Sequence, residues 1–348
     1  MIARDEYGRP ADIPGGFKPW PVAPEKDRDQ WSVIRLYDQG YAGAYRDPEA
    51  DEQFLSGLHY KTFASAASDN PGLEGSGEGK AALLYRYVLA LSKQSSKPNP
   101  YEVAQRRGDC VSFSTRNASD ALRATEIAVK GDIEAWVNET ATEPIYWYRG
   151  HSGEGASCSR LAEWLTKAGG MMLRQDYPDL RLNLTEYDPS LGANGSQGPS
   201  VAVRTLAAEH QVKYATLVKS VEEARDALAN GFPLSVCSGY SFSNVRSKDG
   251  IAQRTMGGWA HAMAWLAVDD SPEARRIGGP LFYVQNSWSN RWNSGGWPNR
   301  YGENPGGGFW IVAKDAAGMI AAGGAYAFSD ATGFRPKTLP HLGAAGRI

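Results

Sequence analysis

The stretch "YVQNSWSNRW", Tyr283–Trp292, places a polar amide at the end of an apolar strand and follows it with two tryptophans. The amide belongs to Asn286, and Trp288 and Trp292 are the tryptophans. The side-chain carbonyl of an asparagine accepts a hydrogen bond from a histidine ring, and an indole over that bond shields it from water. The stretch therefore favours a site in which Asn286 orients a histidine beneath Trp288.

Two other stretches carry the partners that such a site needs. "GGWAHAMAWLAV", 257–268, puts His261 inside an apolar strand, and "GDC", 108–110, puts Cys110 at the start of a predicted helix. Unpaired N–H groups and the partial positive charge of a helix N-terminus stabilise a thiolate. A thiol nucleophile also needs a base, and the base needs an orienting group. Considered alone, Cys110 and His261 are each typical of buried packing residues. Cysteine, histidine and asparagine in this order along the chain predict thiol catalysis.

These motifs resemble those of the papain-like cysteine proteases over roughly residues 101–330. "NSWSNRW" followed by "GGGFWI" is similar to their "NSWGxxWG…GY", "CVSFS" to their "CWAFS", and "GDC" to the calpain branch. The resemblance implies that Cys110 attacks the scissile carbonyl, His261 acts as base and acid, and Asn286 holds the imidazole. The family histidine follows its cysteine by about 130–150 residues, and His261 follows Cys110 by 151 (261 − 110). Asn286 lies further from Cys110 than the family spacing, and a hairpin insertion, "DDSPEARRIGG", at 269–279 explains the extra residues.

The resemblance also implies residues that bind the substrate. Gln105 would hold the oxyanion together with the backbone N–H of Cys110, although it lies one residue closer to the cysteine than is usual. An extended peptide would pair by strand addition along an edge formed by "GEGAS", where Glu154 replaces a family glycine. The implied substrate-binding residues are Gly153, Glu154, Gly155, Ala260 and Trp288. Val111 stands where the family has an aromatic residue.

The order of predicted elements indicates an α+β fold with a helical half and a sheet half. The resemblance implies the papain-like form of this class, in which a helical half that carries the cysteine packs on a mostly antiparallel sheet with the histidine and the asparagine. Helical patterns come first and apolar strands follow. The predicted helices cover 111–130, 159–170 and 221–231. The expected organisation is a Pro-rich arm and extension at 1–100, a catalytic domain at 101–336 that divides near residue 200, and a tail at 337–348. A Gly/Ser-rich link is expected at 68–80.

Composition and net charge indicate which classes of binding partner and which cellular compartment to expect. The net charge is −2 and no basic run is present, so nucleic acid and membrane surfaces are not expected partners. No apolar stretch is long enough for a signal peptide or a bilayer span. An odd count of three cysteines argues against a disulfide framework, so Cys158 and Cys237 are expected to be packing residues in a cytoplasmic protein or a particle assembled there. No Cys/His cluster has zinc spacing, and neither a metal nor a cofactor is predicted.

Three functions stay open at this level. The first is a cysteine peptidase acting on peptides or proteins. The second is a papain-fold structural or binding component of a larger assembly, such as a viral particle, docked through the Pro-rich arm at residues 1–28. The third is a cell-wall amidase of the cysteine/histidine type, which would lack the segment around Asn286. His151 is a rival base, but no "NSW" motif accompanies it.

Overall fold

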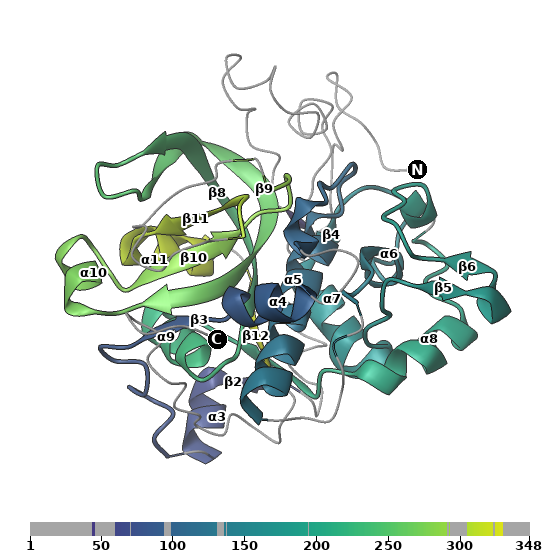
Figure 1. Cartoon of the computed structure of the whole chain (residues 1–348), viewed down its shortest axis with the longest axis horizontal. Helices are drawn as coiled ribbons and strands as arrows, with labels where there is room; N and C mark the ends of the chain where they lie inside the picture. Colours follow the sequence, from purple (N-terminus) through teal and green to yellow (C-terminus); the bar gives the residue numbers. More distant parts are fainter. Residues whose placement is uncertain are drawn as a thin grey trace.

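A computed structural model shows a helical half beside a large sheet (Figure 1). It describes residues 44–45, 60–69, 71–93, 99–130, 136, 138–193, 195–290, 292, 305–322 and 324–329. The Pro-rich arm at 1–28 and the tail at 337–348 lie outside these residues. Within the described part, no helix has the length and apolar character that a bilayer crossing requires.

Helix α5, Cys110–Thr125, is the centre of the helical half, and every one of its residues is buried. It packs against α4 (Tyr85–Ser92), α6 (Thr142–Trp147), α7 (Cys158–Glu163) and the sheet. The wider turns η3 (Glu126–Lys130) and η4 (Trp164–Ala168) continue α5 and α7. The helices predicted at 111–130 and 159–170 are therefore confirmed. Helix α8, Val201–Ala207, completes this half, with short turns at η2 (Pro100–Glu102), η5 (Pro178–Leu180), η6 (Leu191–Ala193) and η7 (Ala208–His210).

The sheet half is built on two long antiparallel strands, β8 (Leu234–Arg246) and β9 (Ala252–Asp269). The strand order is β11-β10-β9-β8-β12-β7-β2, with β3 on β9. The other strands are β10 (Leu281–Gln285), β11 (Gly308–Ile311), β12 (Ala325–Ser329), β7 (Tyr214–Leu217), β2 (Tyr60–Thr62) and β3 (Ala81–Leu83). All pair antiparallel except β2 and β7. The α+β class predicted from the sequence, with a helical half and a mostly antiparallel sheet, is confirmed.

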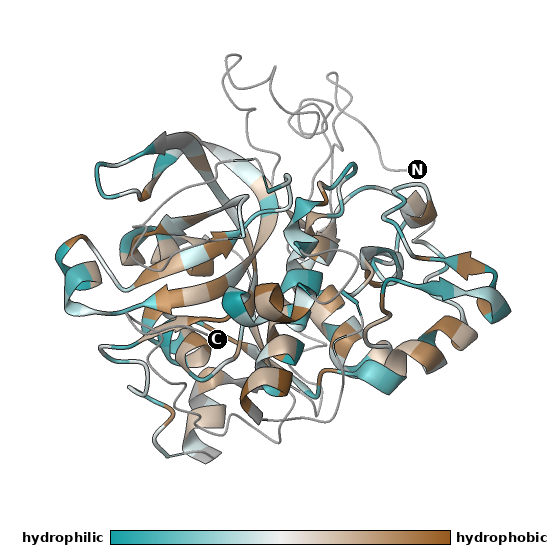
Figure 2. Ribbon diagram, viewed as in Figure 1, coloured by the Kyte–Doolittle hydropathy of each residue, from teal (hydrophilic) through white to brown (hydrophobic). Residues whose placement is uncertain are grey.

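Three helices accompany the sheet. Helix α9, Val221–Ala229, lies near β9, and α11, Ala313–Ala322, packs on β8. Helix α10, Pro272–Arg276, lies in the connection between β9 and β10, so the insertion predicted at 269–279 is present. The sheet strands carry many hydrophobic residues, whereas α10 is mostly hydrophilic (Figure 2). Only Ala274 of α10 is buried, and it packs into the hydrophobic core.

Residues before position 100 contribute to the same sheet and helical packing. Strand β2 pairs with β7, β3 pairs with β9, and α3 (Phe63–Asp69) follows β2. The Gly/Ser-rich stretch is bound to the sheet half, because the N–H groups of Gly75 and Gly77 donate to the Asp226 carboxylate at 2.7 and 2.9 Å. Strands from both sides of residue 100 therefore share one sheet, and the domain boundary there stays a prediction.

Two small strand pairs lie outside the large sheet. Strand β1, Ala44–Tyr45, runs parallel to β4, Ala156–Ser157, and approaches β8 and β9. Ala44 is only 1% exposed. The second pair, β5 (Asp176–Tyr177) and β6 (Leu182–Asn183), is an antiparallel hairpin in the helical half. Strand β1 therefore lies between the two halves of the molecule.

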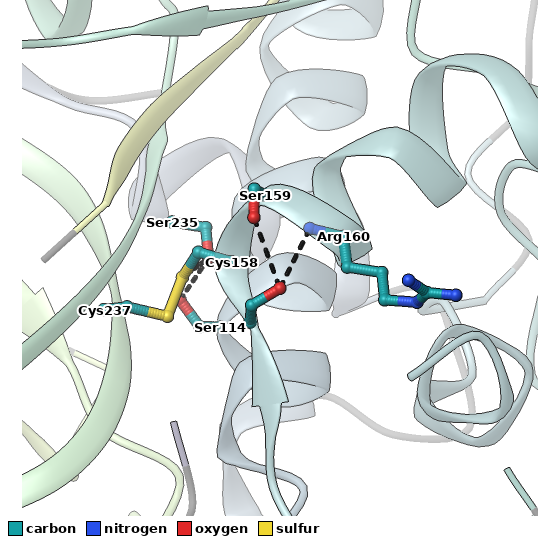
Figure 3. The surroundings of a disulfide bond; sticks show 7 residues. Ser114, Cys158, Ser159, Arg160, Ser235 and Cys237 are labelled. Carbon is teal, nitrogen blue, oxygen red and sulfur yellow. Dashed lines mark hydrogen bonds between the residues drawn. A yellow bond between two sulfur atoms is a disulfide. The ribbon is translucent and has the colours of Figure 1, made fainter. Parts of the chain in front are cut away.

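Cys158 and Cys237 form a disulfide, which corrects the expectation that both are free packing residues (Figure 3). Cys158 starts α7, and Cys237 lies on the facing strand β8. Their Cα atoms are 6.0 Å apart, a distance that a disulfide spans. The three cysteines therefore comprise one disulfide-bonded pair and Cys110, which is not part of a disulfide. Because disulfides persist in oxidising compartments, the cysteine count no longer supports a reducing one.

Candidate active site

His261 and Asn286 are bound to each other, as the sequence motifs predict. His261 lies on β9 and Asn286 follows the last residue of the neighbouring strand β10. The ring Nε2 of His261 lies 2.7 Å from the side-chain Oδ1 of Asn286, and both residues are buried. The backbone N–H of Ser287 donates to the same Oδ1 at 2.7 Å, so this atom is an acceptor. Nε2 of the neutral ring therefore carries the proton, and Nδ1 is left with the lone pair of a base.

Tryptophan rings enclose the histidine–asparagine pair. The indole of Trp288 stacks on the imidazole of His261 with 4.9 Å between ring centroids. Trp259 and Trp292 approach Trp288 edge-on at 4.7 and 5.1 Å. Trp288 is where the sequence predicts a shield against water. Trp259 was missed, although it lies two residues before His261 on the same strand, and its ring meets the imidazole edge-on with 6.1 Å between centroids.

Burial lowers the pKa of His261 to about 4, and the hydrogen bond to Asn286 opposes this shift. The imidazole is therefore neutral at pH 7 when no anion lies beside it, and it can accept a proton. A thiolate within reach of the ring would raise the pKa again, because an opposite charge favours the imidazolium form.

Cys110 is the first residue of α5, and its side chain has no exposed surface. Its position at the helix start places the N-terminal N–H groups and the positive end of the helix dipole around the thiol. Helix α5 packs directly on β9, the strand that carries His261. The structure thus brings the helix that begins at Cys110 and the strand that carries His261 together across the boundary between the halves.

Gln105 is buried and bound to the segment that carries Asn286. Its backbone N–H donates to the carbonyl of Ser287 at 2.8 Å, and the Ser287 hydroxyl donates to its side-chain Oε1. Its Nε2 donates to the carbonyl of Arg107 at 2.8 Å. An amide nitrogen has two N–H groups, so this bond uses one of them. Gln105 lies one residue closer to Cys110 than is usual in the family, and the loop between them is held by the bonds of Gln105 to Ser287 and to Arg107.

Asp109, directly before Cys110, is a buried acid that the sequence reading left without a role. Burial raises its pKa to about 8, against the hydrogen bond from the hydroxyl of Tyr187 and the charge of Arg107, which lower it. Tyr187 donates to Oδ2 of Asp109 at 2.7 Å. The carboxyl is therefore largely protonated at pH 7 and places little negative charge beside the thiol. Tyr187 is 78 residues away, and no sequence motif marks it.

Glu154 points toward the loop before Cys110. Its carboxylate forms an ion pair with Arg107 and accepts hydrogen bonds from the N–H of Gly108 at 2.7 Å and the hydroxyl of Tyr146 at 3.1 Å. The N–H of the next residue, Gly155, donates to the carbonyl of Gly108 at 3.0 Å. The segment expected to bind substrate is thus joined to the loop that precedes Cys110.

The other expected substrate-binding residues lie in two places. The carbonyl of Gly153 accepts a hydrogen bond from Arg149 at 2.8 Å in the helical half. Ala260 and Trp288 lie beside His261 in the sheet half, and both are buried. The segment with Glu154 and Gly155 and the segment with Ala260 therefore belong to opposite halves, and their role in substrate binding stays a prediction.

His151, the rival base, lies in the connection between α6 and β4. Burial lowers its pKa to about 4, and the charges of Arg149 and Arg160 add to this. The asparagine of the motif binds His261 and not His151. Among the described residues, no three His, Cys, Asp or Glu side chains gather as ligands for a metal ion.

Comparison with known proteins supports the fold. No protein-family model and no curated protein sequence matches the chain significantly. The cysteine protease Amb a 11 of ragweed pollen, in its proform, is similar in structure, with a TM-score of 0.51, 12% identity, and coverage of 90% of this chain and 83% of that protein. Xylellain, a cysteine protease from Xylella fastidiosa, has a TM-score of 0.46, 17% identity, and coverage of 72% and 86%. Bromelain from Ananas comosus, in complex with E64, has a TM-score of 0.43, 13% identity, and coverage of 72% and 98%. The chain therefore has the papain-like cysteine protease fold that its motifs predict.

Proposed function

We propose that the chain is a cysteine peptidase in which Cys110 is the nucleophile, His261 the base and Asn286 the residue that orients the base. The observation that carries this proposal is the hydrogen bond from His261 Nε2 to Asn286 Oδ1 beneath Trp288. That bond leaves Nδ1 of the imidazole as a proton acceptor on β9, the strand against which the helix of Cys110 packs. The low pKa of the buried ring keeps it unprotonated at neutral pH.

In the proposed reaction, the thiol of Cys110 gives its proton to Nδ1 of His261, and the thiolate attacks the scissile carbonyl carbon. The tetrahedral oxyanion accepts hydrogen bonds from the backbone N–H of Cys110 and from Nε2 of Gln105, whose orientation is fixed by Ser287 and Arg107. The C–N bond then breaks as the imidazolium protonates the leaving amine. Water, deprotonated by His261, hydrolyses the thioester and restores the thiol.

The proposed substrate is an extended peptide or protein segment seated beside Gly155, along β4. Strand β1 supports this, because it is an extended segment of the chain that pairs with β4 and buries Ala44 between the halves. A substrate on this edge takes the place of β1, since one strand edge pairs with one partner. The cleavage preference depends on which side chains fit beside β8 and β9.

The test is labelling of the full-length chain with a thiol-directed epoxide, combined with an assay of peptide hydrolysis. We expect one label, on Cys110, and no hydrolysis by Cys110→Ala. An Ala44→Asp variant is tested in parallel, because a carboxylate is disfavoured at the buried Ala44 position and loosens β1. Faster labelling of this variant supports binding of substrate beside β4. No label and no hydrolysis in either folded protein would contradict the peptidase proposal.

The alternative function, a papain-fold binding component, predicts a folded protein in which Cys110 is unreactive and no peptide is hydrolysed.

Docking through the Pro-rich arm stays a separate proposal, tested by deleting residues 1–28 and measuring association by size exclusion. Unchanged association would count against docking. The cytoplasmic location likewise stays a prediction, and it is tested by fractionating cells that express the chain.

A further inference from the structure

The Cys158–Cys237 disulfide joins the two halves of the molecule covalently. Cys158 begins α7 in the helical half, and Cys237 lies on β8 in the sheet half, 79 residues later. Both residues are almost fully buried, at 4% and 2% exposure. Figure 3 shows the bond reaching from the end of β4 across to the sheet. It therefore lies in the interface between the halves and not on the surface.

On the sheet side, the disulfide is attached next to the proposed base. Cys237 is paired with Ala262 in the β8–β9 register, and the following residue, Ser238, is paired with His261. A displacement of β8 at Cys237 is therefore passed to His261 through the strand pairing.

On the helical side, the disulfide lies near the helix of the nucleophile. The sulfur of Cys158 is 3.8 Å from the hydroxyl of Ser235, which shares a hydrogen bond of 2.8 Å with the hydroxyl of Ser114 (Figure 3). Ser114 is on α5, four residues and thus about one helical turn after Cys110. The covalent link joins α7 to β8, and the hydroxyl pair joins α5 to β8 about one helical turn after Cys110.

We propose that the Cys158–Cys237 disulfide is a positioning element that keeps His261 within reach of Cys110. The proposal rests on the proposed peptidase function. The nucleophile and the base belong to opposite halves, so their separation depends on how the halves are held together. A displacement of about 1 Å in a reacting group lowers a rate by as much as about a hundredfold. Cys237 is next to Ser238, the residue that pairs with His261, so a covalent link at Cys237 limits such displacement.

This role makes the oxidation state of the chain important. Two electrons and two protons from a dithiol such as dithiothreitol convert the Cys158–Cys237 bond into two thiols, and the dithiol becomes a cyclic disulfide. The proposed mechanism needs Cys110 as a thiol, whereas the positioning role needs Cys158 and Cys237 oxidised. Activity is thus expected to fall under reducing conditions strong enough to open the buried bond, with Cys110 still present as a thiol.

The experiment compares the full-length wild type with the double variant Cys158→Ser/Cys237→Ser. A non-reducing digest of the wild type must first yield the linked Cys158–Cys237 peptide; its absence from freshly purified protein overturns the proposal. In the double variant, well below its melting temperature, we expect kcat to fall roughly tenfold to a hundredfold while KM changes by less than about twofold. We also expect Cys110 to lose its reactivity toward iodoacetamide at low pH, which a merely less stable protein would keep.

A stability-matched control separates positioning from loss of stability. Leu165→Ala removes a fully buried side chain of the helical half that belongs neither to the disulfide nor to the hydroxyl pair, and it is expected to lower the melting temperature while kcat is kept. A double variant with the kcat and alkylation profile of the wild type overturns the positioning role and leaves the peptidase proposal intact. A wild type without hydrolysis and without low-pH reactivity of Cys110 overturns both.

Discussion

The helical half holds the segment around Cys110 through charged and hydrogen-bonding side chains, whereas the sheet half holds His261 and Asn286 among packed aromatic rings. Around Cys110, the carboxylate of Glu154 binds Arg107 and the N–H of Gly108. Deeper in this half, Arg174 pairs with Glu143 at 2.9 Å, and both side chains are buried. The conformation of the loop before Cys110 therefore depends on the protonation and charge of its neighbours.

Around His261, the contacts are largely between rings. Trp288 stacks on the imidazole, and Trp259 and Trp292 pack edge-on against Trp288. The second layer is also aromatic, with Phe309 against Trp292 at 5.5 Å. Such packing is sensitive above all to lost volume, because a removed ring leaves a cavity. The difference indicates that changes of size will damage the sheet half most, and changes of charge the helical half.

The largest effect is expected from Trp288→Ala. Removing a buried indole leaves a cavity and lowers the free energy of unfolding by about 3–5 kcal/mol. The His261–Asn286 bond also becomes accessible to water, so peptide hydrolysis falls as well. Urea unfolding and kcat measure the two effects. Trp288→Phe, which keeps a ring, is the control and is expected to lose clearly less; equal losses in the two variants would contradict a packing role.

The buried acid beside Cys110 is expected to make the helical half less stable as the pH rises. The pKa of Asp109 is raised from 3.8 to about 8, so the folded state keeps a proton that the unfolded state releases. This contribution to stability is complete below pH 4 and is lost as the pH rises toward 8. The loss amounts to about 4 kcal/mol by pH 7. Asp109→Asn, a neutral isostere, is therefore expected to be more stable than the wild type at pH 7.

The measurement is the difference in unfolding free energy between Asp109→Asn and the wild type from pH 4 to 8. We expect the difference to grow with pH in favour of the variant. Tyr187→Phe serves as a second comparison, since it removes the hydroxyl that donates to Asp109. A difference that stays constant with pH would show that Asp109 is ionised in the folded protein.

The sheet half is expected to respond to pH in the opposite direction. The pKa of His261 is lowered from 6.5 to about 4, so the unfolded state binds a proton that the folded state does not. This stability is present above pH 6.5 and is lost as the pH falls toward 4, by about 3 kcal/mol. The measurement uses Cys110→Ala, which has no thiolate to raise the pKa, against Cys110→Ala/His261→Gln. Parallel pH curves for these two proteins would contradict the account.

The smallest of the expected effects comes from the ion pair near Cys110. Glu154→Ala leaves the N–H of Gly108 and the guanidinium of Arg107 without their carboxylate, which lowers the free energy of unfolding by about 1–3 kcal/mol. Glu154→Gln keeps an acceptor for Gly108 and is expected to lose less. Thermal unfolding compares them, and the kcat of Glu154→Ala reports the loop before Cys110. Unchanged stability in both variants would show that this contact is unimportant.

The sequence predicts those contacts of the site in which a single motif contains both contacting residues or residues directly beside them. Asn286, Trp288 and the strand of His261 are adjacent or on neighbouring strands, and their chemistry leaves few arrangements. The fold class followed from the order of helical and strand patterns. Long-range pairings had no such signal: nothing in the spacing of Cys158 and Cys237 shows that α7 faces β8. The inward turn of Glu154 and the partner of Asp109 depend on the same tertiary packing.

The central claim is that Cys110 and His261 form a thiolate–imidazolium pair across the boundary between the halves. The most direct measurement is the rate of Cys110 alkylation by iodoacetamide from pH 4 to 9, in the full-length wild type and in His261→Ala. We predict that the wild type reacts at low pH with an inflection well below the ordinary thiol pKa, and that His261→Ala shows one inflection near about 8.5. Identical profiles with an inflection near the ordinary value in both proteins would contradict the pair.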